Sequence, residues 1–310
     1  MNRKEIILPG KIAVESSSDK MYFIYDSSFS SKSKFNVIYD KKIRYSGFSW
    51  MNTSNEFIGI ESFHTDTSGT YKGNVVRFDL GGNIVERIYE SAENEIAGGT
   101  YLSVNDKNLI FMTLKSNKRT ENPLEGLTPM LSLVIMDFEK KQVIKKIDSI
   151  GRAPNFEMHE SPWLFDESRF IYSISGENKI IVEGVNINPV EEQAGIYIYD
   201  IVTDQKKLLV PNARFGVCSP VDLRIAYLKD QMIEVLNLKD NSTKMVYKTG
   251  SKEKISNIHW TPDGKYIYLV YFKNYSSNYF DSGEKLIEVS TGKEIPFKKI
   301  GHGFHSYTWK

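Results

Sequence analysis

The chain repeats one pattern six times, and a repeat limits the architecture more than any other feature of a sequence. In each copy a short polar turn precedes a run of β-branched and aromatic residues, and a second apolar run then ends in Asp or another polar residue. The clearest copy is Ile255 to Phe272, with the sequence ISNIHWTPDGKYIYLVYF. Each copy predicts an inner strand, a strong second strand, and a hairpin of a third and a fourth strand. The predicted strands include an outer strand at Ile43–Tyr45 in the first copy, an inner strand at Phe48–Trp50 in the second, second strands at Phe170–Ile174 and Tyr266–Phe272, and an outer strand at Glu294–Phe297 in the last copy.

The apolar content of these runs indicates how the strands pack. The second strands are apolar at nearly every position, as in strands that are buried on both faces, whereas the third strands alternate. Pairs such as Asp263-Gly264 and Gly81-Gly82 give the backbone freedom that tight hairpins need. One four-stranded sheet cannot bury both of its faces alone, but sheets packed side by side around an axis can. The sequence therefore predicts an all-β, six-bladed β-propeller with four-stranded antiparallel blades, in one domain spanning residues 1–310.

Both ends of the chain offer an inner strand for the first blade. One candidate is Ile12–Val14, and the other is the run from Gly303 to Trp309. We expect one of them to complete the blade while the other runs beside it, so that a terminal strand closes the ring. The sequence leaves open which terminus does so.

Three tryptophans, Trp50, Trp163 and Trp260, end the predicted inner strands of their copies. We expect them to pack between blades; the alternative is a ring of aromatic side chains that stacks on a ligand. The single cysteine, Cys218, ends another inner strand, and we expect it to be a buried small apolar residue.

Composition excludes several classes of protein. The chain has 40 Lys and Arg against 39 Asp and Glu, a formal net charge of +1, so no electrostatic footprint for nucleic acid is present. One cysteine excludes an internal disulfide and argues against a Cys-based zinc site. No run of 18 apolar residues predicts a transmembrane helix, and residues 1–10 do not form a signal peptide. The compartment stays open: cytoplasmic as the sequence stands, periplasmic or cell-surface if a leader was removed.

Some copies resemble a known repeat. His259 to Tyr268 (HWTPDGKYIY) with Lys285 to Lys293 (KLIEVSTGK) resembles the WD40-like, PD40-type repeat of bacterial TolB-like propellers. Ile196 to Lys206 matches the second half of that repeat, while Ser161–Asp166 and Cys218–Asp222 match the first half loosely. The resemblance implies a TolB-like propeller. The same repeat occurs in periplasmic TolB-like proteins and in the propeller domains of prolyl-oligopeptidase-like peptidases, so it implies a fold without an activity.

Linear catalytic motifs are absent. The sequence has no Gly-x-Ser-x-Gly elbow, no phosphate-binding or dinucleotide-binding glycine loop and no calcium loop. His302 and His305 stand three residues apart, without a third metal ligand beside them. These absences favour a protein that is not an enzyme, although enzymatic activity stays open.

Long connections between second and third strands hold the better functional clues. They span residues 63–74, 115–130, 176–195 and 272–283, and in a propeller they emerge on the same face as the links between blades. The apolar run Lys179–Val182 indicates a strand pair projecting from the rim. The last connection mixes aromatic and small polar residues, as recognition surfaces do, and its binding candidates are Tyr275, Tyr279, Phe280 and Asp281. The alternative is a loop packed on itself.

Four polar residues precede predicted inner strands and are expected at the axial mouth: Arg152, His159, Glu160 and Arg214. Their alternative role is to hydrate the channel. Together these patterns favour a monomeric, non-enzymatic module that recognises a protein, peptide or glycan through the long-loop face. The first alternative is a calcium-dependent hydrolase or lyase at the axial channel, using Glu160, His159, Asp66 and His302; the second is a purely structural propeller. The sequence indicates no cofactor, and calcium binding stays open.

Overall fold

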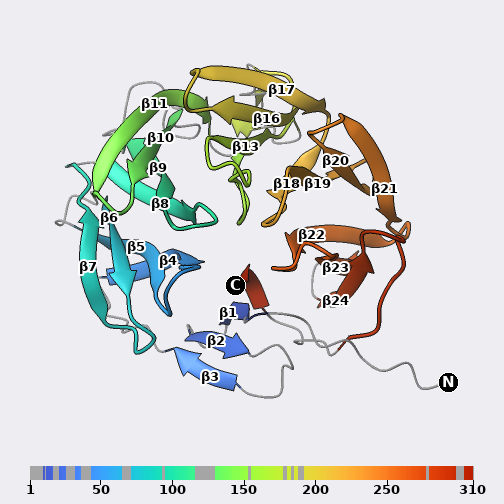
Figure 1. The fold of residues 1–310 in the computed structure, drawn as a ribbon, viewed down its shortest axis with the longest axis horizontal. Coiled ribbons are helices and arrows are strands. Elements are labelled where there is room, and N and C mark those ends of the chain that lie inside the picture. The colour runs from blue at the N-terminus through green and yellow to red at the C-terminus, as the bar shows by residue number, and fades with distance from the viewer. Residues whose placement is uncertain are drawn as a thin grey trace.

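The structure is a computed structural model. It describes residues 10, 12–16, 21–25, 32–35, 43–64, 71–92, 95–115, 130–152, 155–176, 180–182, 185–187, 192–276, 279–297 and 304–309. Every regular element in these residues is a strand, and the sheets surround a common axis, as Figure 1 shows. The predicted β-propeller is therefore confirmed.

Five sheets of the described chain have four strands each, which are antiparallel throughout. From the axis outwards, these sheets are β25 (Phe304–Trp309), β1 (Ile12–Ser16), β2 (Met21–Tyr25) and β3 (Lys32–Phe35); β4 (Ile43–Trp50), β5 (Phe57–His64), β6 (Tyr71–Phe78) and β7 (Ile84–Tyr89); β8 (Glu95–Leu102), β9 (Asn108–Lys115), β10 (Met130–Asp137) and β11 (Gln142–Arg152); β12 (Phe156–Glu157), β13 (Arg169–Ile174), β16 (Gly195–Asp200) and β17 (Gln205–Pro211); β18 (Arg214–Cys218), β19 (Arg224–Lys229), β20 (Met232–Asn237) and β21 (Ser242–Lys248).

The prediction of six four-stranded blades is wrong. Five described sheets have four strands, while β22 (Glu253–Trp260), β23 (Tyr266–Ser276) and β24 (Tyr279–Glu288) form a sheet of three. The predicted fourth strand of that last copy, Glu294–Phe297, makes only a single bridge, between Glu294 and Ile287. Pro296 explains the interruption, because proline has no N–H to donate to the next rung of a ladder.

The C-terminal strand closes the ring. β25 pairs antiparallel with β1, with Trp309 opposite Ile12, and it forms the inner strand of that sheet. Closure by a terminal strand is therefore confirmed. The predicted inner strand Ile12–Val14 lies second from the axis instead. The predicted outer strand Ile43–Tyr45 is the beginning of β4, the inner strand of the next sheet.

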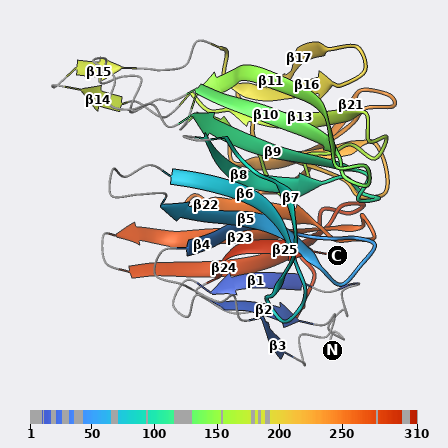
Figure 2. The same ribbon diagram turned by 90° about the vertical axis from the view of Figure 1, so that its left-hand side faces the viewer.

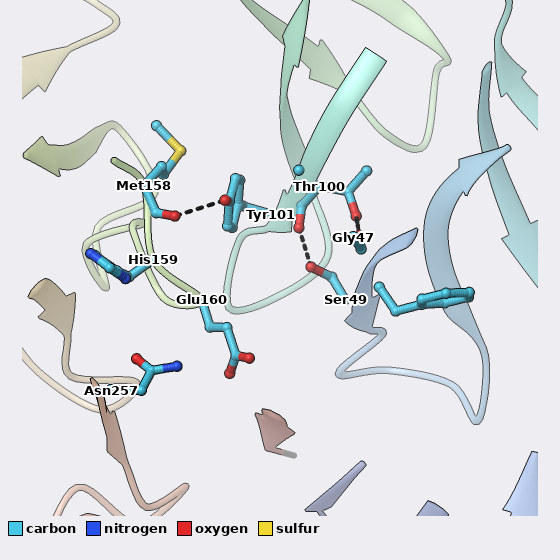
Figure 3. Close-up of a pocket in the computed structure, with 10 residues that line it drawn as sticks. Gly47, Ser49, Thr100, Tyr101, Met158, His159, Glu160 and Asn257 are labelled. Atoms are coloured by element: carbon cyan, nitrogen blue, oxygen red, sulfur yellow. Dashed lines mark hydrogen bonds between the residues drawn. The ribbon is translucent and has the colours of Figure 1, made fainter. Parts of the chain in front are cut away.

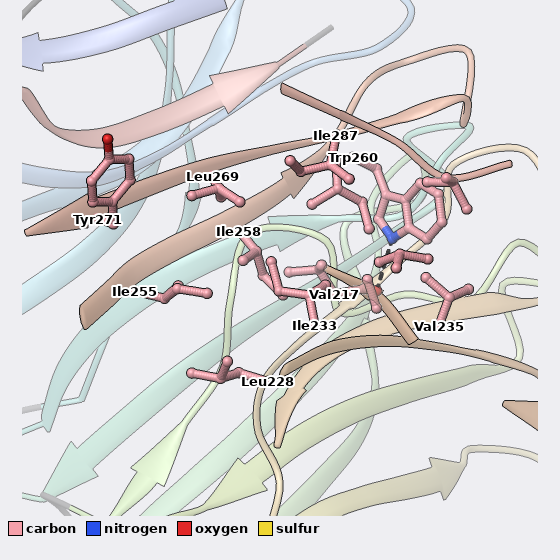
Figure 4. Packing of buried hydrophobic residues seen from close by; sticks show 14 residues of the cluster. Val217, Leu228, Ile233, Val235, Ile255, Ile258, Trp260, Leu269, Tyr271 and Ile287 are labelled. Carbon is pink, nitrogen blue, oxygen red and sulfur yellow. Dashed lines mark hydrogen bonds between the residues drawn. The ribbon is translucent and has the colours of Figure 1, made fainter. Parts of the chain in front are cut away.

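Packing of tryptophan between sheets is confirmed for Trp163 and Trp260, whereas Trp50 packs on Phe57 within its own sheet. Trp163 Nε1 donates to the carbonyl of Tyr101 at 3.0 Å, and Trp260 Nε1 donates to the carbonyl of Val217 at 3.1 Å. Both bonds run to the neighbouring sheet, as Figure 4 shows for Trp260. Cys218 holds the same register position and is 1% exposed; its Sγ lies 3.2 Å from the carbonyl of Pro162. Burial raises the pKa of the Cys218 thiol, so this thiol stays protonated and able to donate.

Apolar side chains fill the space between sheets. In the cluster drawn in Figure 4, Val217 and Leu228 from β18 and β19 pack with Ile258 and Leu269 from β22 and β23. All four are at most 4% exposed. The core therefore lies between blades rather than along the axis. Side chains of the inner strands, such as Val217 and Ile258, are fixed by this packing.

A half-buried ion pair between Glu253 and Lys285 joins the start of β22 to β24 within the last sheet. Glu253 accepts from Lys285 Nζ at 2.8 Å and from the Gly250 N–H at 3.1 Å, and its side chain is 13% exposed. Tyr247, on β21, contributes a further hydrogen bond to the carboxylate. Glu95 repeats this arrangement with Tyr89 and Lys146 at the start of β8.

We expect Glu253→Gln to weaken the fold in a pH-dependent way. Burial opposes ionisation of Glu253, but the Lys285 and Gly250 hydrogen bonds outweigh it and hold the pKa of the carboxyl below its usual value of 4.5. A carboxyl with a lowered pKa stabilises the folded state above the unfolded pKa, and this contribution disappears as the pH falls through the folded pKa. The variant should lose about 1–3 kcal/mol at pH 7 and less at pH 3, because the carboxyl loses its charge as the pH falls through its folded pKa; urea unfolding measures both values.

The matched control for this prediction is Glu294→Gln. Glu294 lies 4.0 Å from the same lysine, but its side chain is 57% exposed. We expect its replacement to change the free energy of unfolding by less than about 0.5 kcal/mol at either pH. A Glu253→Gln effect that is the same at pH 7 and pH 3 contradicts the assignment.

Two of the long connections contain strands. The predicted projecting pair is confirmed as a separate two-stranded sheet of β14 (Ile180–Val182) and β15 (Val185–Ile187), which stands away from the ring in Figure 2. Between β23 and β24 only residues 277 and 278 lie outside the described chain, so the predicted aromatic loop is the end of a long hairpin. Most of the connection at 115–130 lies outside the described residues. Within them, no helix has the length and hydropathy needed to cross a membrane.

Candidate functional site

The inner strands share a bulge near the middle of their length. Four of them, β4, β8, β18 and β22, each carry one residue more than the strand they pair with. In β4 and β8 the bulge contains a glycine in the left-handed region, with φ of 63° at Gly47 and 60° at Gly99. A bulge bends its strand and changes where the side chains point. The repeated bulges therefore shape the inner wall of the ring.

The inner strand beside β13 departs further from regular pairing. Glu157 pairs with Ser173, and the next pairing joins Trp163 to Phe170. Five residues, 158–162, thus stand opposite two residues of β13; we call 158–162 the crossing segment.

Contacts with three other sheets fix the crossing segment. The Tyr101 hydroxyl on β8 donates to the carbonyl of Met158 at 2.7 Å. The rings of His159 and Phe215 lie 5.0 Å apart, and Phe215 belongs to β18. His259 Nδ1 on β22 lies 3.0 Å from the carboxylate of Glu160. The segment is therefore held in place by side chains far from it in sequence.

A pocket of about 190 Å³ opens between the crossing segment and the bulged strands. Its lining comes from β4, β8, the crossing segment and β22, and Figure 3 shows these side chains. The lining residues are Gly47, Phe48, Ser49, Gly99, Thr100, Tyr101, Met158, His159, Glu160 and Asn257.

Every hydroxyl group in this lining donates its proton to a backbone carbonyl. The Ser49 hydroxyl donates to the carbonyl of Thr100, the Thr100 hydroxyl donates to the carbonyl of Gly47, and the Tyr101 hydroxyl donates to Met158 (Figure 3). A carbonyl oxygen has no hydrogen, so in each bond the hydroxyl must be the donor. Toward a ligand, these oxygens offer only lone pairs.

Glu160 brings a carboxylate to the pocket. In Figure 3 its side chain extends into the space bounded by Asn257, Tyr101 and Ser49. It is 24% exposed, while its partner His259 is 5% exposed, as expected of a packed histidine. Burial, and then the negative charge of Glu160, raise the pKa of Tyr101 well above its ordinary value, so this phenol stays protonated.

The structure brings three of the eight predicted site residues together. His159 and Glu160 line the pocket, and the Arg214 guanidinium lies 5.2 Å from the Phe215 ring, on which His159 also packs. The other five sit elsewhere in the strands, with side chains outside the described part of the structure: Arg152 ends β11, Tyr275 lies in β23, and Tyr279, Phe280 and Asp281 lie in β24. Their role in binding stays a prediction.

Sequence reasoning missed Ser49, Thr100, Tyr101 and Asn257 as lining residues. For Ser49, Thr100 and Tyr101 the signal was the glycine within the inner strand, since an isolated glycine in a strand pattern indicates a bulge or a close backbone approach. Gly47 fits that rule: a Cβ built on it would lie 3.3 Å from the backbone nitrogen of Gly99. Asn257 lies in β22, which contains no glycine.

The metal site of the alternative function has no support in the described chain. Those residues contain no group of three or more His, Cys, Asp or Glu that could hold a metal ion. Asp66 and His302, which that alternative also used, lie outside the described residues. Calcium binding stays a prediction.

Comparison with solved structures places the chain among β-propellers. TolB from Acinetobacter baumannii superposes with a TM-score of 0.60 at 13% identity, over 98% of this chain and 67% of that one. An acylaminoacyl peptidase from Pyrococcus horikoshii superposes with a TM-score of 0.56 at 11% identity, over 94% of this chain and 44% of the peptidase. An oligogalacturonate lyase from Vibrio parahaemolyticus superposes with a TM-score of 0.50 at 12% identity, over 89% of this chain and 85% of the lyase. No family model and no curated protein matches the sequence.

These similarities confirm the TolB-like propeller at the level of fold. At such identities they show the fold alone, and the three proteins carry names of different activities. This chain matches less than half of the length of the peptidase. The function must therefore be argued from the pocket.

Proposed function

We propose that this chain is a non-enzymatic binding module, which recognises a segment of a protein or peptide through the pocket on the inner wall of the ring. The observation that carries the proposal is the lining itself: acceptor groups and one carboxylate, held by four separate elements of a packed array. Binding sites on rigid elements hold their geometry better than sites on loops.

The chemistry of the lining supports binding rather than catalysis. Ser49 is the lining serine, and its proton is donated to a backbone carbonyl, which cannot serve as a general base. An activated serine needs a base within hydrogen-bond reach. His159 packs against Phe215, and its Nε2 lies 3.6 Å from Glu157. The described pocket thus lacks a nucleophile paired with a base.

The size of the pocket limits what enters it. Sites for drug-sized ligands occupy about 300–1,000 Å³, whereas this one has about 190 Å³. A single side chain of a partner fits that volume, and the rest of the partner then lies on the surface around it. The hairpin end with Tyr275 and Tyr279 is the predicted place for these outer contacts.

Filling the pocket should remove binding. Peptides selected from a random displayed library on the wild-type protein are expected to bind Ser49→Tyr at least tenfold more weakly, because the new ring occupies the space of the ligand side chain. Fluorescence anisotropy of a labelled selected peptide measures the change. Ser290→Tyr, at an exposed turn, is the control and should bind within twofold of the wild type. Equal affinity for wild type and Ser49→Tyr, with an unchanged melting temperature, contradicts the proposed site.

A further inference from the structure

We infer that the pocket selects a protonated amine or guanidinium carried on an alkyl chain, as in a lysine or arginine side chain. This inference rests on the proposed function, and it names the chemistry that the pocket accepts. Its basis is the direction of the hydrogen bonds in the lining, together with the carboxylate and the apolar walls.

The hydrogen-bond directions make most of the lining an acceptor surface. Because Ser49, Thr100 and Tyr101 each donate their only proton to a carbonyl, their remaining capacity is to accept. An ammonium has three donors and no acceptor, and a guanidinium has five donors and no acceptor. A carboxylate or phosphate, which has acceptors alone, would meet the lone pairs of these three hydroxyls without a proton between them; the donor groups of the lining belong to Asn257 and His159.

The lining carries a negative charge, which attracts a cation. Among the described lining residues, Glu160 is the one with a formal charge when histidine is neutral. A hydrogen bond between a charged donor and a carboxylate is roughly twice as strong as a neutral one. The Arg214 guanidinium lies 5.2 Å from the centre of the Phe215 ring, which packs against His159.

The walls fit an alkyl stem. Met158 and the Tyr101 ring contribute apolar and aromatic surface to the pocket. The Phe48 ring instead packs against Phe57 and Phe78 in the core of its own sheet. Lysine and arginine bury their methylene groups against such surface while their charged ends reach polar groups. Aromatic faces also attract a cation within about 6 Å of the ring centre. Neutral aliphatic side chains would fill the same space but would offer no donor to the Glu160 carboxylate, which also lies 3.0 Å from His259 Nδ1.

Methionine methyl NMR tests the inference in the pocket itself, because Met158 lines it. Protein labelled at its methionine methyl groups is titrated with the N-acetyl methylamides of lysine, arginine, norleucine and glutamate, and with free pentylamine, at constant ionic strength. The Met158 signal is assigned from the Met158→Leu spectrum. We expect saturable shifts of Met158 with the cationic probes, and an affinity at least tenfold lower for norleucine and glutamate. Tighter binding of pentylamine than of the lysine probe would identify a free amine, rather than a peptide, as the source of the cation.

Glu160→Gln is the decisive variant. It keeps the size of the side chain and removes the charge, so the affinity for the cationic probes should fall at least tenfold. Glu157→Gln, outside the lining, should stay within twofold of the wild type. If norleucine or glutamate shifts Met158 as strongly as lysine, the pocket binds ligands but the inference of a cation is wrong. If no probe shifts Met158 although selected peptides still distinguish Ser49→Tyr from the wild type, the inference fails while the proposed function stands; if neither occurs, both fail.

Discussion

Deletion of residues 304–310 is expected to abolish cooperative unfolding of the chain. These residues include β25, which is the inner strand of the closing sheet and pairs with β1 along its length. Without β25, the N-terminal strands lose their link to the end of the chain, and β1 becomes an exposed edge beside the axis. Small proteins are stable by only about 5–15 kcal/mol, so loss of ring closure should remove most of that margin. Differential scanning calorimetry measures the outcome.

The control for this deletion is a cut of similar length elsewhere. Replacing residues 180–187 with a Gly-Ser linker removes β14 and β15, which form a sheet of their own. Since an isolated two-stranded hairpin adds little stability, this variant should keep its transition within about 1 kcal/mol of the wild type. A β25 deletion that unfolds as cooperatively as the control contradicts closure by the C-terminal strand.

Trp260→Ala is expected to lower the free energy of unfolding by about 3–5 kcal/mol. The side chain is 5% exposed, packs between β22 and the preceding sheet, and donates a hydrogen bond to Val217. Truncation removes the apolar contact area and leaves a cavity beside Ile233 and Ile287, both fully buried. Trp260→Phe keeps most of the area but loses the hydrogen bond, and it should cost about 1–2 kcal/mol. Guanidinium unfolding at pH 7 gives both values.

The ranking of the variants distinguishes packing between blades from a ligand-stacking role. Val202→Ala, at a position 79% exposed, should change stability by less than about 0.5 kcal/mol. A Trp260→Ala effect below 1 kcal/mol, joined to a loss of peptide binding, would instead support the ring of ligand-stacking aromatics.

Sequence periodicity predicted most strands because second strands buried on both faces are apolar throughout. The runs from Phe170 to Ile174 and from Tyr266 to Phe272 both lie in strands that the structure shows, β13 and β23. Errors arose where glycine or proline interrupts a strand. Gly47 divided β4 into two predicted strands, although it forms a bulge with φ of 63° in one continuous strand. Pro296 had the opposite effect, since the sequence around it is apolar enough for a strand that proline cannot complete.

The position of a terminal strand could not be derived from its own residues. Ile12–Val14 and the run ending at Trp309 have the same pattern, and only their mutual pairing decides which lies nearer the axis. The pattern gives residue types and the direction in which side chains alternate; it does not give the order of strands that come from opposite ends.

The pocket was only partly predictable for the same reason. His159 and Glu160 stood out as polar residues before an inner strand, and the structure places both in the lining. The hydroxyls of Ser49, Thr100 and Tyr101 have an acceptor role because of bonds to carbonyls across bulges and across sheets. No spacing in the sequence encodes those bonds. The donors and acceptors of a site built between repeats emerge only when the sheets are assembled.

A crystal structure of the protein with N-acetyl-lysine methylamide tests the central claim most directly. We predict that the ammonium nitrogen lies within about 3 Å of the Glu160 carboxylate, with the methylene chain against the Tyr101 ring. A probe bound at another surface, or a pocket that holds the acetyl or amide end with the ammonium in solvent, contradicts the account.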